Sequence, residues 1–291
     1  MLTTTTPVTL YRSTDADAPQ ITPTEGAIKT VFEACLVTGY GDKQPLGFEM
    51  PFSDNHRAVF RSKNEQSSRL YFQLDNSEKT RAQVTGYRTM TALNQGTGQF
   101  PERPLGIVSE YASHNRKTHW ALVGCDKALW FVTCGDYSRY SQMSFIGDFK
   151  STVAADPYNF CLINTVDSST YLSSSQQPRF NPSHRGTVAM DYNALNPVTV
   201  SPQSALFHDF AQYPDPICQG LNLAPIFLRE HLQEDYSSVR GLLPGVFASD
   251  VYKMEQPTFT ILDHFEGTTD QFMLIKHQHH VSFININHWA M

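Results

Sequence analysis

The sequence predicts an α+β fold that is predominantly antiparallel β, with one N-terminal amphipathic helix packed on a sheet. One apolar stripe with helical spacing lies between residues 24 and 39, and short apolar or alternating segments separated by turn residues follow it. Charged residues make up only 17% of the chain, against a usual share of about 25%. Neutral polar residues replace them, and such a surface suits β-rich folds and wide contacts with other proteins.

We expect the helix to run from Thr24 to Gly39. Thr24 is suited to cap its N-terminus, and Glu25 follows in the first turn, where the helix dipole favours an anion. Gly39 and Gly41 then supply the C-terminal stop. The apolar residues recur at positions i, i+3, i+4, i+7 and i+8 and form a single stripe: Ile28, Val31, Phe32, Cys35 and Leu36.

Residues 1–23 are expected to form an extended N-terminal arm, because Pro7, Pro19 and Pro23 restrict any helix there. A Thr-rich terminus of this kind either hangs free or docks on a neighbouring protein. We expect docking, so that deleting residues 1–9 would impair assembly more than folding.

Three short strands are predicted after the helix, at residues 58–61, 70–74 and 81–88. The segment Asp75–Ser77 forms the turn between the last two, and residues 94–104, rich in Gly and Pro, form a loop. The clearest hairpin joins residues 120–123 to residues 128–133. Both arms of this hairpin are almost wholly apolar, so we expect it to be central and covered on both faces.

The rest of the chain is predicted to be β-rich and continuous with what precedes it. Gly147 and Asp148 form a turn between two apolar segments, and residues 158–166 form a strand before a Ser/Gln-rich loop at 168–178. Five prolines make residues 181–216 an irregular, partner-binding excursion across the surface. Further strands are expected at 258–262, 272–276 and 281–286, with a turn at 266–269. The chain thus divides into the arm 1–23, a helix-plus-sheet region 24–150 and a β-rich region 151–291.

Charge and hydropathy exclude two classes of partner. The net charge is −6 and the isoelectric point about 6.0, with no basic block, so we expect no nucleic-acid binding. No segment approaches the roughly 20 apolar residues that span a bilayer, and the first residues lack a secretory signal, so we expect no membrane insertion. The five cysteines are odd in number and widely spaced, which indicates reduced thiols in a protein made in a cytosol.

Histidines near the end are the main candidates for metal binding. His277 and His279 would point the same way on a strand, with His280 and His288 nearby. A polar strand end explains them better, because no CxxC or HExxH motif accompanies them. We therefore predict no metal-ligating residue, no cofactor-binding residue and no cofactor.

No catalytic signature is present either, and we predict that the protein is not an enzyme. A nucleophile elbow is absent. The Gly-x-Gly tripeptides Gly39–Gly41 and Gly96–Gly98 do not lie between a strand and a helix, as a dinucleotide site requires. The carboxylates Asp15 with Asp17, or Asp148 with Asp156, could pair as in a glycosidase, but acidic turns are the commoner explanation. We predict no catalytic residue.

The three tryptophans differ in their expected roles. Trp120 and Trp130 lie inside apolar strands and are expected in the core, whereas an exposed face of aromatic residues would suit carbohydrate binding. Trp289 lies in the polar tail His288–Met291, so we expect it to anchor in a pocket of a neighbouring protein.

An ordered series of short motifs in the first third of the chain points to a family. The series consists of Tyr11–Asp15, Ala18–Pro19, Ala34–Val37, Gly39–Gly41, Lys43, Pro51–Phe52, Ala58–Arg61, Ser68–Phe72, Gly86–Tyr87, Met90, Gly96–Gly98 and Phe100–Pro101. Read together, residues 10–101 resemble a family of virion structural proteins of tailed bacteriophages, and Phe145–Phe149 is a weaker match. The resemblance implies a particle component without catalytic residues.

The leading hypothesis is therefore a structural protein of a tailed-phage virion, in the tail, the baseplate or the head–tail junction. It would be assembled in the host cytoplasm in several copies, and its partners would be other virion proteins and copies of itself. The alternative is a receptor- or glycan-binding module of a tail fibre or spike, which would recognise a host surface glycan. A cell-wall or capsule hydrolase is the third hypothesis.

Overall fold

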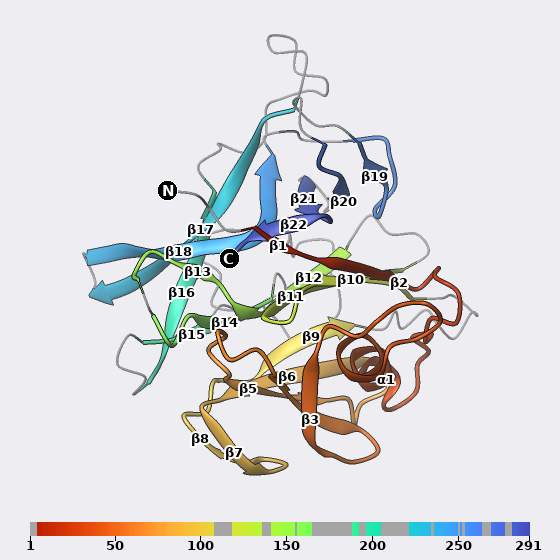
Figure 1. Ribbon diagram of the computed structural model, residues 1–291, viewed down its shortest axis with the longest axis horizontal. Helices are drawn as coiled ribbons and strands as arrows, with labels where there is room; N and C mark the ends of the chain where they lie inside the picture. The colour runs from red at the N-terminus through yellow and green to blue at the C-terminus, as the bar shows by residue number, and fades with distance from the viewer. Residues whose placement is uncertain are drawn as a thin grey trace.

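The structure is a computed structural model whose described residues form four antiparallel sheets and one short helical segment (Figure 1). Every strand pairing is antiparallel, which confirms the expected class of a predominantly antiparallel β protein with one short helix. The structure describes residues 5–107, 118–135, 141–154, 156–164, 188–191, 196–204, 221–233, 236–249, 251, 254–263, 269–276 and 281–291.

The largest sheet has 13 strands and draws on both halves of the chain. Its path runs through β19 (Ile261–Leu262), β20 (Phe272–Lys276), β21 (Val281–Asn285), β18 (Tyr236–Ser249), β17 (Leu223–Gln233), β16 (Pro197–Ser204), β15 (Val188–Met190), β14 (Phe160–Asn164), β12 (Ser141–Asp148), β11 (Ala128–Gly135), β10 (Thr118–Gly124) and β2 (Thr9–Arg12). A short strand, β13 (Lys150–Ser151), pairs with β18 beside this path.

A five-stranded sheet lies below the large sheet in the view of Figure 1. It consists of β3 (Phe48–Ser53), β4 (Arg57–Ser62), β5 (Tyr71–Asp75), β6 (Arg81–Tyr87) and β9 (Arg103–Ile107). The strands expected at 58–61, 70–74 and 81–88 are β4, β5 and β6, so these predictions are confirmed to within a residue or two. Two small sheets complete the fold: β7 (Thr89–Ala92) with β8 (Gln95–Thr97), and β1 (Thr5–Pro7) with β22 (His288–Ala290).

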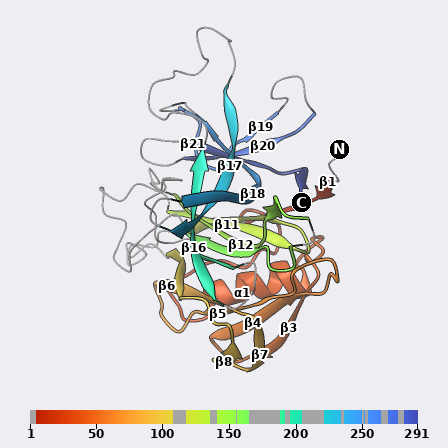
Figure 2. The ribbon, with the colours of Figure 1, turned by 90° about the vertical axis from the view of Figure 1, so that its left-hand side faces the viewer.

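The helical segment is shorter than the sequence predicts. It consists of α1 (Ala27–Glu33) and a π-helical turn, η1 (Ala34–Thr38). All five residues of the predicted stripe are fully buried. The ring of Phe32 lies 6.2 Å from that of Phe60 in β4 and 5.0 Å from that of Phe131 in β11, so this side chain meets both large sheets. Figure 2 shows α1 between β11 and β12 on one side and β4 on the other.

The predicted cap of this helix is wrong. The residue before α1 is Gly26 with φ of +81°, and the hydroxyl of Thr24 interacts with that of Thr22 instead. The capping oxygen comes from Asn76, whose side-chain Oδ1 accepts hydrogen bonds from the backbone amides of Ile28 at 2.8 Å and Lys29 at 3.4 Å. A residue that the sequence assigns to a turn therefore satisfies the first amides of the helix. Gly39 does end the segment, with φ of +77°.

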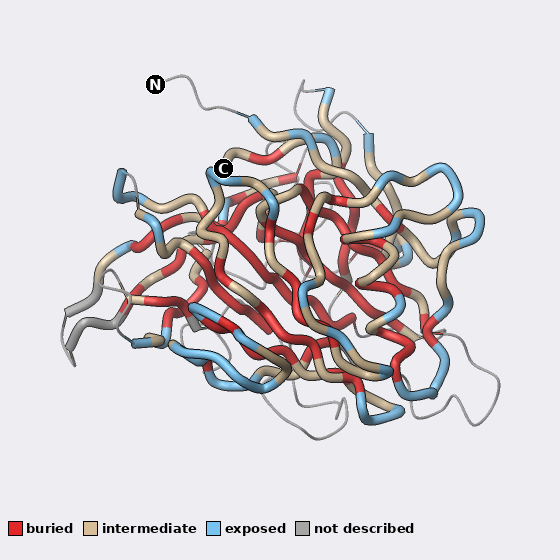
Figure 3. The backbone as a smooth tube through the Cα atoms, turned by 60° about the horizontal axis from the view of Figure 1, so that its bottom comes forward, coloured by how far each residue is buried: buried red, intermediate tan, exposed pale blue. Residues whose placement is uncertain are grey.

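The hairpin of β10 and β11 separates two hydrophobic cores. Alternate side chains point to opposite faces, and the residues in the inner part of the hairpin are all buried. Figure 3 shows that the buried residues gather in the interior of the molecule. The first core, toward α1 and the five-stranded sheet, includes Trp120, Leu122, Leu129 and Phe131. The second core, on the other face, includes Ala121, Val123, Trp130 and Val132. The prediction that this hairpin is covered on both faces is confirmed.

Several predicted loops and turns contain strands. The loop at 94–104 holds β8 and the start of β9, and the excursion at 181–216 holds β15 and β16. Gly147 and Asp148 lie inside β12 rather than in a turn, because this end of the strand pairs with β14 and Gly147 also pairs with Ala128 of β11. Glycine is required at position 147, since its φ is +130° and a side chain there would lie 2.5 Å from the Cα atom of Ala128. Of the strand expected at 258–262, only β19 is formed.

The remaining strand predictions divide into confirmed ones and ones that lie outside the described residues. The strands at 158–166, 272–276 and 281–286 appear as β14, β20 and β21. The loop at 168–178 and most of the turn at 266–269 lie outside the described residues.

The two ends of the chain pair with each other. Thr5, Thr6 and Pro7 of β1 lie opposite Ala290, Trp289 and His288 of β22, and β2 pairs with β10 of the large sheet. Figure 1 shows β1 and β22 side by side. Residues 5–12 are thus extended, as predicted, and they pair within their own chain, while their docking on a neighbouring protein stays a prediction.

Candidate functional site

A cleft of about 540 Å³ lies between the start of the chain and strand β20. This volume falls within the usual range of about 300–1,000 Å³ for ligand pockets. The residues that line it come from five parts of the chain: Arg12, Ser13, Thr14, His119, Trp120, Cys134, Gly135, Glu255, Pro257, Thr258, Phe259 and Lys276.

One wall of the cleft is built at the ends of three neighbouring strands. Arg12 ends β2, His119 lies near the start of β10, and Cys134 lies near the end of β11, directly opposite His119. The backbone extends the ladder past β2, since the amide of Ser13 donates to the carbonyl oxygen of Trp120 at 2.9 Å and the amide of Trp120 donates to Oγ of Ser13 at 3.3 Å. Strand register therefore fixes this wall.

The opposite wall is the segment 255–259 with the end of β20. The amide of Phe259 donates to the carbonyl oxygen of Leu274 at 2.8 Å, and the amide of Lys276 donates to Oγ1 of Thr258 at 3.2 Å. Thr258 Oγ1 also lies 3.2 Å from Oγ of Ser141. Phe259 has φ of +71°, an unusual conformation for a non-glycine residue, which these contacts hold in place.

The charges of the cleft are incompletely paired. Arg12 donates through Nε to Oδ1 of Asp15 at 3.3 Å, and its side chain is 40% exposed. Asp15 also accepts from the Arg12 amide and from the hydroxyl of Tyr40. In the part of the chain that the structure describes, neither the ammonium of Lys276 nor the carboxylate of Glu255 has an ion-pair partner. The cleft thus offers two cations and one carboxylate to a ligand.

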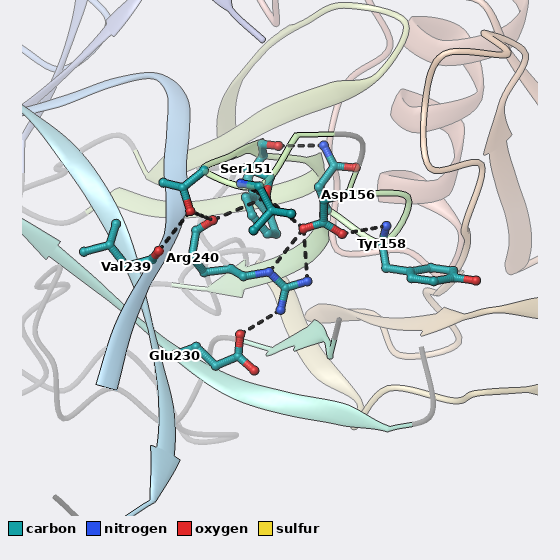
Figure 4. Close-up of polar contacts among 10 residues, drawn as sticks. Ser151, Asp156, Tyr158, Glu230, Val239 and Arg240 are labelled. Atoms are coloured by element: carbon teal, nitrogen blue, oxygen red, sulfur yellow. Dashed lines mark hydrogen bonds and ion pairs between the residues drawn. The ribbon is translucent and has the colours of Figure 1, made fainter. Parts of the chain in front are cut away.

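The most buried charges of the structure form a separate network around Arg240 in β18 (Figure 4). The guanidinium donates to Oε2 of Glu230 at 2.7 Å and to Oδ2 of Asp156 at 3.2 Å, and all three side chains are nearly inaccessible to solvent. Ser151 and the amide of Tyr158 also donate to Asp156. Each carboxylate is engaged, so this network links β13, β17 and β18 structurally.

Asp148 is a second buried carboxyl group, only 3% exposed at the end of β12. It accepts from the amide of Ser68 at 2.7 Å and from the Ser68 hydroxyl at 2.5 Å, and thereby ties the segment before β5 to the large sheet. Burial raises the pKa of Asp148 to about 7, against the opposing effect of the Ser68 hydrogen bonds. Its role in the described contacts is structural.

The carboxylate pairs considered from the sequence have structural partners. Asp15 pairs with Arg12, while Asp17 occupies a positive-φ position with φ of 58°. Asp148 and Asp156 bind Ser68 and Arg240 respectively, and both side chains are buried. Neither pair lines the cleft described above, and within the described residues no group of three His, Cys, Asp or Glu side chains could hold a metal ion.

Of the four candidate histidines, one lies in the described part of the chain. His277, His279 and His280 lie outside the described residues. His288 is described, and its Nε2 lies 3.5 Å from Oδ2 of Asp270. It pairs in register with Pro7 across the β1–β22 ladder.

All three tryptophans are buried, so they cannot supply an exposed aromatic face. Trp120 and Trp130 are in the core as predicted. Trp289 is only 1% exposed; its ring packs against Gly245 and its Nε1 donates to the carbonyl oxygen of Asn285 at 2.8 Å. The expectation that Trp289 anchors in a neighbouring protein is therefore wrong, because Gly245 leaves room for the ring inside this chain.

The described thiols are free and buried, in agreement with the expectation of reduced cysteines. Burial raises the pKa values of Cys35, Cys125 and Cys161, so these thiols stay protonated and are poor nucleophiles. Cys218 lies outside the described residues. None of the helices in the described part of the chain is long and apolar enough to span a membrane.

Sequence reasoning missed the cleft. Its residues are not close in sequence and match no motif. Strand register brings positions 12, 119 and 134 together, and Lys276 joins them through Thr258, which contacts Ser141. The one available signal was the segment Tyr11–Asp15, which belongs to the motif series and contributes three lining residues. Comparisons with protein-family profiles and with curated protein sequences give no match.

Proposed function

We propose that the protein is a structural component of a tailed-phage virion, assembled in several copies in the host cytoplasm. Its partners are other virion proteins and copies of itself, and its place is the tail, the baseplate or the head–tail junction. The resemblance of residues 10–101 to such proteins is the basis of the proposal.

One observation carries it: the motifs that make the resemblance lie at positions that determine the packing of one layer. Tyr11, Phe60, Phe72 and Phe100 are almost fully buried in the first core, as are Cys35 and Leu36. Gly39 and Gly41 adopt positive φ angles, where other residues are strained. A resemblance at such positions is one of architecture, and it supports a scaffold role rather than a shared catalytic site.

The surface also supports an assembly role. Only 17% of the residues are charged, and among the described residues the exposed large hydrophobic side chains are Val153 at 45% and Val239 at 49%. A neutral polar surface can form wide contacts with little desolvation of charge. In this proposal α1, packed between the sheets through its apolar stripe, braces the layer that faces the neighbouring subunits.

Mass spectrometry of purified particles from a phage that encodes this chain tests the proposal. We expect the chain to be found in the particles at a constant ratio to the major capsid protein, and to be located in a particle reconstruction. A host protein of similar abundance in the lysate serves as the control for contamination. If the chain is depleted together with that host protein during purification, the proposal is wrong.

A receptor- or glycan-binding module is the second candidate, and the cleft is the observation that favours it. The cleft is polar and of the size that accommodates a small ligand. The cleft takes the place of an exposed face of aromatic residues as the basis of this candidate, since all three tryptophans are buried. Nothing among the described residues favours the third hypothesis, a hydrolase.

A further inference from the structure

The cleft contains two cations, Lys276 and Arg12, which need solvent or a ligand as partners. Lys276 is half-buried at the end of β20 and lacks an ion-pair partner among the described residues. Arg12 uses only its Nε nitrogen in the contact with Asp15, which leaves its terminal nitrogens as donors. Charge-assisted hydrogen bonds from Lys and Arg to a carboxylate are among the stronger polar contacts in proteins.

The rest of the lining suits a hydroxylated ligand. Thr14 is exposed at one wall, and Thr258 lines the other, where its hydroxyl accepts from the amide of Lys276 and contacts the hydroxyl of Ser141. Pro257 and Phe259 add apolar surface beside these hydroxyls. A sugar ring combines hydroxyl groups at its rim with C–H groups on its faces, so it can use both kinds of contact.

Glu255 restricts the choice of anion. Its exposed carboxylate lines the same cleft, and it would repel a multiply charged anion such as phosphate or sulfate. A ligand with a single carboxylate and several hydroxyl groups is repelled less, because its one negative charge can lie on the two cations.

We propose that the cleft binds an acidic sugar, of the uronic or sialic acid class, with its carboxylate on Lys276 and Arg12. The hydroxyl groups of Thr14 and Thr258 then contact the ring hydroxyls, and Phe259 lies along the apolar face of the ring. This inference rests on the second candidate function and not on the virion proposal. Particle composition tests the virion proposal, and sugar binding by the isolated protein tests this inference, so each can fail while the other holds.

Calorimetric titration of the full chain tests the inference, with glucuronic acid and N-acetylneuraminic acid as probes and glucose as the neutral control. We expect at least one acidic sugar to bind and glucose to bind at least about tenfold more weakly, as expected for loss of a charge-assisted contact. The methyl glycoside of the acidic sugar that binds then identifies the source of the ligand. Equal affinity for the glycoside indicates a unit linked in a polysaccharide, whereas weaker binding of the glycoside indicates a free sugar, because the glycoside lacks the anomeric hydroxyl.

Two substitutions should move the affinity in opposite directions. Lys276→Gln should weaken binding of the acidic sugar about tenfold or more, because it removes a cation that contacts the carboxylate. Glu255→Gln should tighten binding several-fold, because it removes a like charge. Lys150→Gln is the matched control, since Lys150 is also a half-buried strand lysine but does not line the cleft.

Three results would overturn the inference. The first is that neither acidic sugar binds to the folded protein. The second is equal binding of glucose, or equal competition by inorganic phosphate, which would indicate a non-selective pocket. The third is an unchanged affinity in both Lys276→Gln and Glu255→Gln, with thermal unfolding used to verify that each variant is folded.

Discussion

Asp148 is the residue whose burial has the clearest consequence for stability. Its pKa is raised from 3.8 to about 7 by desolvation, so the folded protein holds a proton there over a pH range in which the unfolded chain is ionised. Between about pH 4 and pH 7 the folded state therefore loses stability as the pH rises. A shift of this size corresponds to a change on the order of 4 kcal/mol, because one pKa unit is about 1.4 kcal/mol.

We accordingly expect Asp148→Asn to alter the pH dependence of stability. The free energy of unfolding of the variant, relative to the wild type, should rise from pH 5 to pH 8, since the amide does not ionise. Urea unfolding at a series of pH values measures this difference, and groups that titrate alike in both proteins cancel. Parallel pH profiles for the two proteins would contradict the expectation.

Gly245 is the residue on which the position of Trp289 depends. Its φ of +71° favours glycine, and a side chain there would collide with the indole ring of Trp289. We expect Gly245→Ala to destabilise the protein by more than about 4 kcal/mol, which is exceptional for a single substitution. Chemical denaturation followed by circular dichroism measures the loss.

Gly47→Ala is the control for backbone strain alone. Gly47 also has a positive φ, of +91°, but a side chain there would meet only the Cβ atom of Asp126 at 3.9 Å. The stability lost in Gly47→Ala should stay near roughly 1–2 kcal/mol, the cost of a non-glycine residue in the left-handed conformation. Equal losses for both variants would mean that Trp289 does not depend on Gly245.

At the scale of elements, the helical segment depends on a residue far away in sequence. Asn76 is fully buried; its oxygen accepts from the first turn of α1, and its nitrogen donates to the carbonyl oxygens of Glu78 at 2.9 Å and Arg81 at 3.1 Å. We expect Asn76→Ala to cost about 2–4 kcal/mol, because several buried partners lose their hydrogen bonds together. Thermal or urea unfolding measures the cost.

Thr24→Ala distinguishes this cap from the one that the sequence predicts. The Thr24 hydroxyl contacts only that of Thr22 at the surface, so its loss should stay within about 0.5 kcal/mol. A larger loss for Thr24→Ala than for Asn76→Ala would restore the sequence-based assignment.

The N-terminal arm is expected to matter for folding rather than for assembly alone. Deleting residues 1–9 removes β1, the partner of β22, and also Val8, which packs against the second core. We expect a clear fall in the midpoint of thermal unfolding, with deletion of residues 1–4 as the control that keeps β1. An unchanged midpoint after deletion of residues 1–9 would instead support a role of this arm outside its own chain.

At the scale of the whole molecule, the two cores on either side of the β10–β11 hairpin share its strands, so we expect them to unfold together. Trp120 reports on the first core and Trp130 on the second. Variants that keep only one of these two tryptophans, with Trp289 replaced by Phe in both, should show the same unfolding midpoint by fluorescence. Distinct midpoints would mean that the cores unfold separately.

The parts of the fold that the sequence predicts are those with local patterns. The stripe from Ile28 to Leu36 and the hairpin of β10 and β11 follow from periodicity and from apolar runs, and both are present. Strands β15 and β16 lie in a segment whose prolines favour a loop, with Pro197 and Pro202 inside β16 itself, yet the neighbouring strands satisfy the rest of their ladders.

Long-range pairing explains the remaining differences. Asn76, Trp289 and the lining of the cleft have roles that depend on residues tens to hundreds of positions away. A single sequence carries no local signal for such contacts. The cleft was therefore beyond prediction, whereas the burial of Trp120 and Trp130 inside apolar strands was not.

The pairing of β1 with β22 also sets an order of events during synthesis. Residues 5–7 leave the ribosome long before their partner strand at 288–290 is made. At about 5–20 residues per second, the first strand waits for on the order of 15–60 seconds without its ladder. A chain that stops before Trp289 can neither complete this pair nor fill the space over Gly245, so this part of the fold can close only after residue 289 has been made.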